Sequence, residues 1–270
     1  RFTYMFDCGS VNREHLEQGL KLCPDGRLDL LFISHLDADH VNGIDALAAR
    51  MQIDSIVLPC LDALQITAIA CEATDDGGLR GSIRSFLKDP TAWCTERGIR
   101  RIYQVRRSGD GDSPIPFDPD GDNPGPIDQD ESGEDDDKPF FLKFHSNAFD
   151  RTVTRTRTGT VDVTVLGDAT SIELAPAVGP LAGQATWVLV PYVHPFAEDT
   201  VSLFRRAVSK VLAVPESLDA ASPYFTRKLL ACLESETNRR ALKACYSILS
   251  SDNNKPSLSL YAGPFGRSHG

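Results

Sequence analysis

Residues 28–34, Leu-Asp-Leu-Leu-Phe-Ile-Ser, constrain the fold more than any other segment of the chain. Apart from Asp29, the run is apolar up to Ser34, without the alternation of apolar and polar residues that a half-exposed strand shows. Such a run is typical of a strand that is buried on both faces within a parallel sheet. The run therefore predicts an α/β domain, in which helices cover the sheet.

Strand and helix signals alternate on both sides of this run. The predicted strands cover residues 2–6, 28–34, 53–59, 100–105, 140–145, 161–166, 187–192 and 257–261. The predicted helices cover residues 42–50, 61–73, 82–87, 91–96, 198–211 and 224–249. These elements divide into an N-terminal half, 1–107, and a continuation of the same α/β domain, 139–270, which includes a helical region at 198–249.

An acidic segment at 108–138 separates the two parts. It holds twelve Asp and Glu residues and one lysine, so its own net charge is −11. The whole chain has a net charge of −10, so the rest of the chain is close to neutral. Because the segment is also rich in Pro and Gly, we expect a disordered insertion. The acidity is thus local, and it does not argue against a nucleic-acid substrate.

The chain of 270 residues has no uninterrupted apolar stretch of the length that a membrane span needs. A cytoplasmic protein without a membrane partner is therefore expected. The seven cysteines include no Cys-x-x-Cys pair, and an odd number cannot all be paired in disulfides. They are predicted to be reduced and mostly buried.

Two histidines and two aspartates lie within six residues, directly after the apolar run: His35, Asp37, Asp39 and His40. Ligands of α/β proteins commonly bind at the carboxyl ends of the strands. Because burying an unpaired carboxylate is costly, these side chains must face water or share a cation. Residues two apart on an extended chain point to one side, so His35 and Asp37 are expected to hold one ion. Asp39 and His40 would reach a neighbouring position. The alternative is a polar turn in which Asp39 caps a helix that begins near Asn42.

Two segments carry a family resemblance: Asp-Cys-Gly-Ser at 7–10 and Ser-His-Leu-Asp-Ala-Asp-His-Val-Asn-Gly-Ile at 34–44. They resemble the first two motifs of the metallo-β-lactamase superfamily, whose second motif is usually His-x-His-x-Asp-His. Asp37 stands where that motif has its second histidine, a variant similar to the hydrolase domain of ComEC-type competence proteins. The resemblance implies a metallo-β-lactamase-like αββα sandwich. Such domains usually open with a hairpin before the Asp-Cys-Gly strand, and this chain has none there, so we expect a sandwich that is incomplete at its start and, if the remaining ligands lie beyond Gly270, at both ends.

The resemblance also implies residue roles. His35 and Asp37 would belong to a first metal site, and Asp39 and His40 to a second. Asp39 would also be catalytic, and Asp7 would support the metal loop from the neighbouring strand. A carboxylate in place of an imidazole makes the ligand set of the site chemically harder, so manganese or magnesium becomes a candidate as well as zinc. Two divalent ions are expected. Two such ions activate a shared water and hold a phosphodiester, so phosphodiesterase or nuclease activity is predicted.

The superfamily normally adds an aspartate in a Gly-Asp-Ala motif and a final histidine. In one interpretation these are Asp168, in Gly-Asp-Ala at 167–169, and His194, after the strand at 187–192. In the other, which we favour, the strand at 257–261 corresponds to the one before that motif, and the remaining ligands lie beyond Gly270.

Two further functions stay open on the sequence. The chain could hydrolyse a peptide or ester bond, because a fold does not determine a substrate. It could also be an inactive binding component of a larger protein complex, for example in bacterial anti-phage defence, with the helical region and the acidic insertion as contact surfaces.

Overall fold

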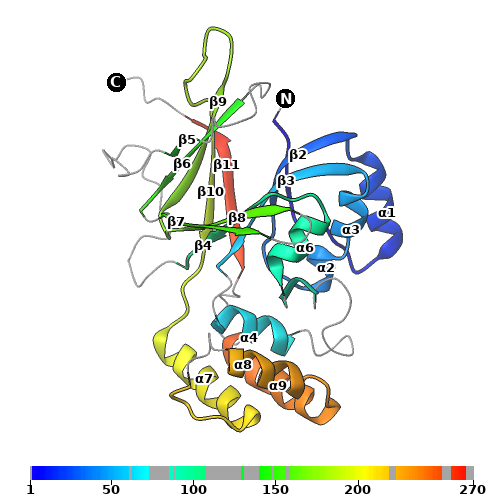
Figure 1. Ribbon diagram of the computed structural model, residues 1–270, viewed down its shortest axis with the longest axis vertical. Coiled ribbons are helices and arrows are strands. Elements are labelled where there is room, and N and C mark those ends of the chain that lie inside the picture. Colours follow the sequence, from blue (N-terminus) through cyan, green and yellow to red (C-terminus); the bar gives the residue numbers. More distant parts are fainter. Residues whose placement is uncertain are drawn as a thin grey trace.

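Strand β2 (Gly26–Phe32) is buried on both faces, as the apolar run predicts. Leu30 and Phe32 face one apolar cluster, and Leu28 and Leu31 face another. The computed structural model describes residues 2–60, 63–72, 85–87, 89–107, 129–130, 140–147, 149–155, 159–218, 223–250 and 257–265. Within them the protein is a mixed α/β structure with two sheets (Figure 1).

The first sheet is mostly parallel and has the strand order β1-β2-β3-β4-β8-β7. Its strands besides β2 are β1 (Tyr4–Phe6), β3 (Met51–Pro59), β4 (Arg101–Val105), β8 (Thr160–Leu166) and β7 (Phe149–Arg155). Neighbouring strands run parallel from β1 to β8, and only β7 is antiparallel to its neighbour. The five parallel strands therefore end at one common edge, which we call the carboxyl edge.

The second sheet is antiparallel and has the order β11-β10-β9-β6-β5. Its strands are β5 (Gln129–Asp130), β6 (Phe140–Ser146), β9 (Thr170–Pro176), β10 (Trp187–Val193) and β11 (Leu258–Pro264). The two sheets share one apolar cluster, in which Tyr103 of the first sheet stacks on Phe144 of the second with ring centroids 4.5 Å apart. The sheets thus pack face to face.

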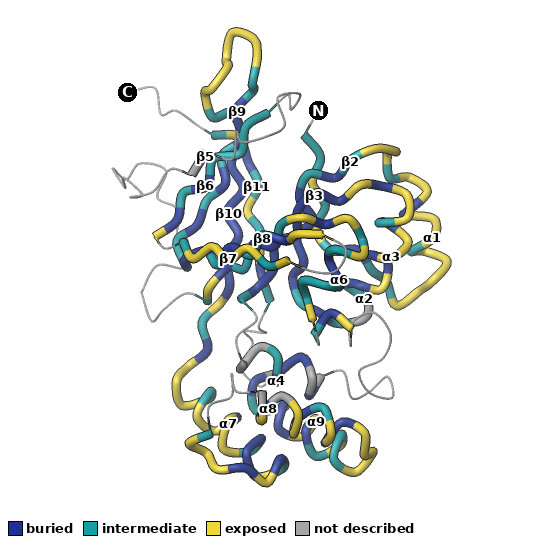
Figure 2. Tube along the Cα trace, in the orientation of Figure 1, coloured by how far each residue is buried: buried dark blue, intermediate teal, exposed yellow. Residues whose placement is uncertain are grey.

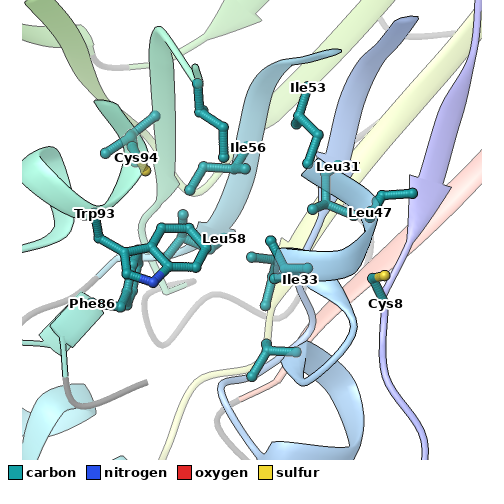
Figure 3. Close-up of a cluster of buried hydrophobic side chains, with 14 of the residues drawn as sticks. Cys8, Leu31, Ile33, Leu47, Ile53, Ile56, Leu58, Phe86, Trp93 and Cys94 are labelled. Carbon is teal, nitrogen blue, oxygen red and sulfur yellow. The ribbon is translucent and has the colours of Figure 1, made fainter. Parts of the chain in front are cut away.

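Helices cover the other face of the parallel sheet. They are α1 (Arg13–Leu22), α3 (Ile44–Ala48) and α6 (Pro90–Glu96), with the short α2 (Ala38–Val41) before α3. Figure 3 shows this layer, in which Trp93 of α6 lies beside Leu58 of β3 and Leu47 of α3 lies beside Leu31 of β2. Phe86 packs edge-on against Trp93, with ring centroids 5.1 Å apart.

A second group of helices forms its own apolar cluster at one end of the molecule (Figures 1 and 2). It consists of α4 (Ala63–Glu72), α7 (Glu198–Leu212), α8 (Pro223–Cys232) and α9 (Glu236–Ser250). Helix α4 follows β3 and α7 follows β10, so the group begins where these two strands end.

The helix predicted at 224–249 is wrong as a single element, because α8 ends at Cys232 and α9 begins at Glu236. Between them, the N–H groups of Glu234 and Ser235 donate to carbonyls three residues back, which closes a tight turn. The break lets both helices contribute to one apolar cluster with α7. Strands β7 and β9 were not predicted, since β7 is largely exposed and rich in Thr and Arg.

The acidic insertion predicted at 108–138 lies outside the described residues, except for Gln129 and Asp130, which form β5 beside β6. Residues 82–84 of the helix predicted at 82–87 also lie outside the described residues, and residues 85–87 are helical. All seven cysteines are free and five of them are buried, as predicted. Among the described helices, none is long and apolar enough to cross a membrane.

Candidate metal centre

His35 and Asp37 lie on the loop between β2 and α2, and Asp39 and His40 lie in α2 itself, at the carboxyl edge of the parallel sheet; residues 35–40 are called the His35–His40 loop below. The loop is tied to both sheets. The N–H of Ile33 donates to the carbonyl of Val57 on β3, and the carbonyl of Ser34 accepts the N–H of Leu258 on β11 at 2.7 Å. The loop therefore begins at a point that hydrogen bonds hold from two sides.

Asp7, at the end of β1, contacts three groups of this loop. Its Oδ1 accepts the backbone N–H of Ser34 at 2.7 Å, and its Oδ2 accepts the Ser34 hydroxyl at 2.7 Å and Nδ1 of His40 at 2.8 Å. Its own N–H donates to the carbonyl of Phe32, and its φ of 57° lies in the left-handed region. Asp tolerates that region better than most residues. The resemblance assigns Asp7 to support of the loop, and these contacts are what such support requires.

Gly9 lets two backbones approach closely. A Cβ at this position would lie 2.5 Å from the carbonyl carbon and oxygen of Asp39. The preceding residue, Cys8, makes two backbone hydrogen bonds to the same region. Its N–H donates to the carbonyl of His40, and its carbonyl accepts the N–H of Gly43. The segment after β1 therefore fixes the backbone of the His35–His40 loop, and only glycine fits at position 9 without a shift.

The hydrogen bonds determine which nitrogen of each imidazole carries the proton. Because a carboxylate only accepts, Nδ1 of His40 donates to Asp7. The Ser34 hydroxyl donates to Asp7 as well, so its oxygen accepts Nδ1–H of His35 at 2.9 Å. The Nε2 atom of both rings is left to face the carboxylates of the loop, and the two ring centroids are 3.8 Å apart. The contact of His40 Nδ1 with the Asp7 carboxylate is of the kind that orients metal-binding histidines, and Ser34 links His35 to the same carboxylate.

Each Nε2 atom faces one carboxylate. Nε2 of His35 lies 3.2 Å from Oδ2 of Asp37, and Nε2 of His40 lies 3.6 Å from Oδ2 of Asp39. A neutral Nε2 with its proton on Nδ1 is an acceptor, as is a carboxylate, so each pair needs a proton or a cation between its atoms. Two ligands of a tetrahedral metal ion with bonds of about 2.1 Å are about 3.4 Å apart. The two pairs thus fit neighbouring ligands of a divalent ion.

The four side chains form two donor pairs rather than one closed set. In the described part of the chain, no group of three or more His, Cys, Asp or Glu side chains is arranged to hold a metal ion. The alternative of a helix cap at Asp39 is wrong, because Asp39 lies inside α2, and α3 begins after Gly43 without a side-chain cap. The evidence for a metal site is therefore the chemistry and the orientation of these two histidine–aspartate pairs.

Asp168 and His194 lie at different distances from the loop. Asp168 follows β8, three strand positions from β2, which corresponds to about 14 Å along the sheet. Its Oδ1 accepts the amide of Asn147 and the N–H of Ala169. His194 directly follows Val193, which pairs with Leu258, the residue bonded to Ser34. The backbone thus places His194, whose side chain is exposed, directly after a strand whose neighbour is bonded to the loop, and Asp168 three strand positions from β2.

Two residues of the site were given no role by the sequence. Ser34 orders both histidines, and its place directly before His35 was the available signal. Cys8 lies beside Asp7 but turns into the apolar cluster (Figure 3). Burial, with smaller contributions from Cys23 and Asp7, raises the pKa of the Cys8 thiol to about 12. Cys8 is therefore a neutral core residue and supplies no thiolate to the site.

Comparisons of the chain with protein-family models, with curated proteins and with solved structures return no match.

Proposed function

We propose that the protein is a metal-dependent hydrolase of the metallo-β-lactamase type that cleaves phosphodiester bonds. The observation that carries this proposal is the arrangement of two imidazoles whose Nδ1 atoms are engaged and whose Nε2 atoms face carboxylates at 3.2 and 3.6 Å. Its place at the carboxyl edge of a parallel sheet supports the proposal, and so do the helix, sheet and sheet layers, which correspond to three of the four layers of an αββα sandwich. The other described helices form their own cluster at one end of the molecule.

The residues of the chain would divide the work. His35 and Asp37 would hold one divalent ion, and Asp39 and His40 a neighbouring one. Divalent ions bound there would lower the pKa of water and polarise a phosphoryl oxygen. Asp7 and Ser34 keep both rings in one orientation, so the Nε2 atoms need no reorganisation when an ion binds.

The charge of the loop supports a phosphodiester rather than an amide or ester. Three carboxylates, those of Asp7, Asp37 and Asp39, share this region with two histidines, so the donors suit hard cations such as Mn²⁺ or Mg²⁺ beside Zn²⁺. Those cations in turn favour phosphate oxygens as further ligands.

The test uses the full chain and the variant Asp37→Asn, which removes one donor charge and keeps the side-chain shape. Bound metal is measured by mass spectrometry of the purified protein, and hydrolysis with bis(p-nitrophenyl) phosphate. We expect bound divalent metal in the wild type and a loss of hydrolysis of at least about 100-fold in Asp37→Asn, the upper range for residues that only support a metal site. Asp25→Asn, at a carboxylate that is 92% exposed, is the matched control and should behave as wild type.

Three other outcomes would overturn the proposal in different ways. Hydrolysis of p-nitrophenyl acetate or a peptide alone would move the reaction to another bond. Metal binding without any hydrolysis would favour a binding component of a larger complex. Absence of metal and of hydrolysis together would remove the metal centre.

A further inference from the structure

Strand β7 is the outermost strand of the first sheet on the side away from β1. It pairs with β8, and among the strands that the structure describes none pairs with its other side. The outer side of such a strand presents a row of backbone N–H and C=O groups that a further strand can pair with. Proteins commonly limit this pairing by short outer strands, by lysine or by proline. The outer strands of this protein differ in these features.

Three of the outer strands have features that limit further pairing. β1 has three residues and β5 has two, and β11 contains Gly263 and ends at Pro264. β7 has seven residues, with the sequence Phe-Asp-Arg-Thr-Val-Thr-Arg, and holds no Gly, Pro or Lys. Its residues 150–153 are exposed, and the β-branched residues at 152–154 favour a strand. β7 is therefore the outer strand that is best suited to pair with another chain.

A second copy of this chain can pair with β7 in antiparallel orientation about a two-fold axis. Such an axis puts one residue of β7 opposite itself and pairs the residues on either side symmetrically. The registers that pair more than half of the strand have the axis at Arg151, Thr152 or Val153. An axis at Arg151 puts this arginine opposite its own copy, and an axis at Val153 puts Arg151 opposite Arg155. Because like charges directly opposite each other destabilise a strand pair, the axis at Thr152 is favoured.

The register centred on Thr152 pairs the whole of β7 with its copy. Thr152 lies opposite Thr152 of the second copy, and cross-strand threonine pairs stabilise strands through hydrogen bonds of their hydroxyl groups. Asp150 lies opposite Thr154, whose hydroxyl can donate a hydrogen bond to the carboxylate. The polar side chains on this face of β7 thus complement one another across the axis.

The arginines of β7 also have suitable neighbours in this register. Arg155 lies opposite Phe149, and a guanidinium is attracted to the face of an aromatic ring. Arg151 lies opposite Val153, which is 57% exposed, so pairing removes apolar surface from water. Arg151 already forms an ion pair with Asp162 of β8, on the side of β7 that is away from the second copy. Its charge is therefore balanced within its own chain.

We propose that two copies of this chain associate through β7, with the two-fold axis at Thr152, so that their first sheets form one continuous sheet. The pairing adds backbone hydrogen bonds along the strand, as in other cases where a strand joins the edge of a sheet. β7 and β1 are at opposite ends of the strand order, so the pairing leaves Asp7 and the His35–His40 loop towards the outer ends of the joined sheet. The proposal is therefore independent of the proposed hydrolase activity.

Sedimentation equilibrium of the full chain tests the association. Because two strands of this length bury less area than a standard interface, we expect a Kd on the order of tens of micromolar. Thr152→Lys and Thr152→Glu each put two like charges opposite each other, so each should raise Kd at least about tenfold. An equimolar mixture of these two variants pairs opposite charges, and its Kd should return to within about threefold of wild type. Val178→Lys, at a valine between β9 and β10 that is 76% exposed, is the matched control and should associate as wild type.

Disulfide trapping then tests the register. Thr152→Cys brings two thiols to directly opposite positions, whose Cβ atoms are about 4.5–5.5 Å apart in a strand pair, so oxidation with diamide should give a covalent dimer. Asp150→Cys is exposed on the same face but lies opposite Thr154, so it should give no more covalent dimer than wild type. A wild type that stays monomeric up to about 1 mM, a mixture that fails to associate, or equal trapping of the two cysteine variants would overturn the proposal.

Discussion

The two edges of the parallel sheet both carry charged clusters, but the clusters differ in how their charges are balanced. At the amino edge, one carboxylate is surrounded by guanidinium groups. At the carboxyl edge, the carboxylates of Asp7, Asp37 and Asp39 face histidines. In open α/β sheets the carboxyl edge is where ligands bind. The comparison therefore separates a cluster that serves the fold from one that is suited to a ligand.

The amino edge is centred on Asp54 of β3, whose side chain is 4% exposed. Arg27 and Arg100 reach its Oδ1 at 2.9 Å, and Arg101 reaches its Oδ2 at 3.0 Å. Arg27 is the second residue of β2, Arg101 is the first residue of β4, and Arg100 directly precedes β4. The cluster thus ties three neighbouring strands together, and its anion is fully engaged by cations of the chain itself.

At the carboxyl edge, carboxylates are in excess over permanent cations. Its histidines are cations only when protonated, so a divalent ion would balance the carboxylates in a way that neutral imidazoles do not. A closed ion network stabilises without a ligand, whereas a site with surplus anionic donors gains from a bound cation. Each of the following variants tests whether the two edges differ in this respect.

The largest effect on stability is expected from Asp54→Asn at the amino edge. Removing one partner of a buried ion network leaves the other charges without compensation, which costs about 3–5 kcal/mol. Urea denaturation at pH 7 measures the loss. Asp25→Asn, whose ion pair with Arg50 is exposed, should change the free energy of unfolding by less than about 1 kcal/mol. An Asp54→Asn protein that is as stable as wild type but binds no metal would break the assignment of the two edges.

Gly9→Ala is expected to have the next largest effect. The added Cβ would meet the backbone of Asp39 at 2.5 Å, and backbone cannot rotate away as a side chain can. We expect a loss of about 2–3 kcal/mol in the free energy of unfolding, together with weaker metal binding, because the loop must shift. Gly19→Ala is the matched control. It lies in α1 with nothing within 4 Å of its Cβ position, and it should stabilise the helix by about 0.5–1 kcal/mol.

These two regions also show what the sequence could and could not predict. The apolar run at 28–34 predicted a strand buried on both faces, because burial of this kind is encoded locally. The pairing of His35 with Asp37 followed from residues close in sequence. The roles of Asp54 and Ser34 depend on partners from other strands, which no local pattern reveals. Each sheet lacked one strand in the prediction, because β7 of the first sheet is largely exposed and β9 of the second sheet has no continuous apolar run.

Asp7→Asn tests the support of the metal loop without a large cost to folding. Asn also tolerates a positive φ, and its amide oxygen still accepts the N–H of Ser34. It does not accept the Ser34 hydroxyl and the His40 ring as a carboxylate does, so His40 loses its fixed tautomer. We expect metal affinity to fall about 10–100-fold, as titrated with Mn²⁺ or Zn²⁺ by calorimetry. Unchanged affinity would show that the histidines do not bind the metal through Nε2.

The smallest effect is expected from Asp89→Ala, at a carboxylate whose partners are backbone groups rather than cations or imidazoles. Asp89 caps α6, and its pKa is lowered from 3.8 chiefly by the N–H of Ala92 and then by the Thr91 hydroxyl. A lowered pKa in the folded state stabilises the protein above the unfolded value, and this contribution is lost as the pH falls through the folded value. Asp89→Ala should therefore cost about 1 kcal/mol at pH 7. The difference in the free energy of unfolding between Asp89→Ala and wild type should shrink below pH 3.8, where Asp89 becomes protonated. In Asp89→Asn the cap does not titrate, so its contribution to stability should not change over this pH range. A difference that does not change with pH would show that the charge of Asp89 does not contribute to the cap.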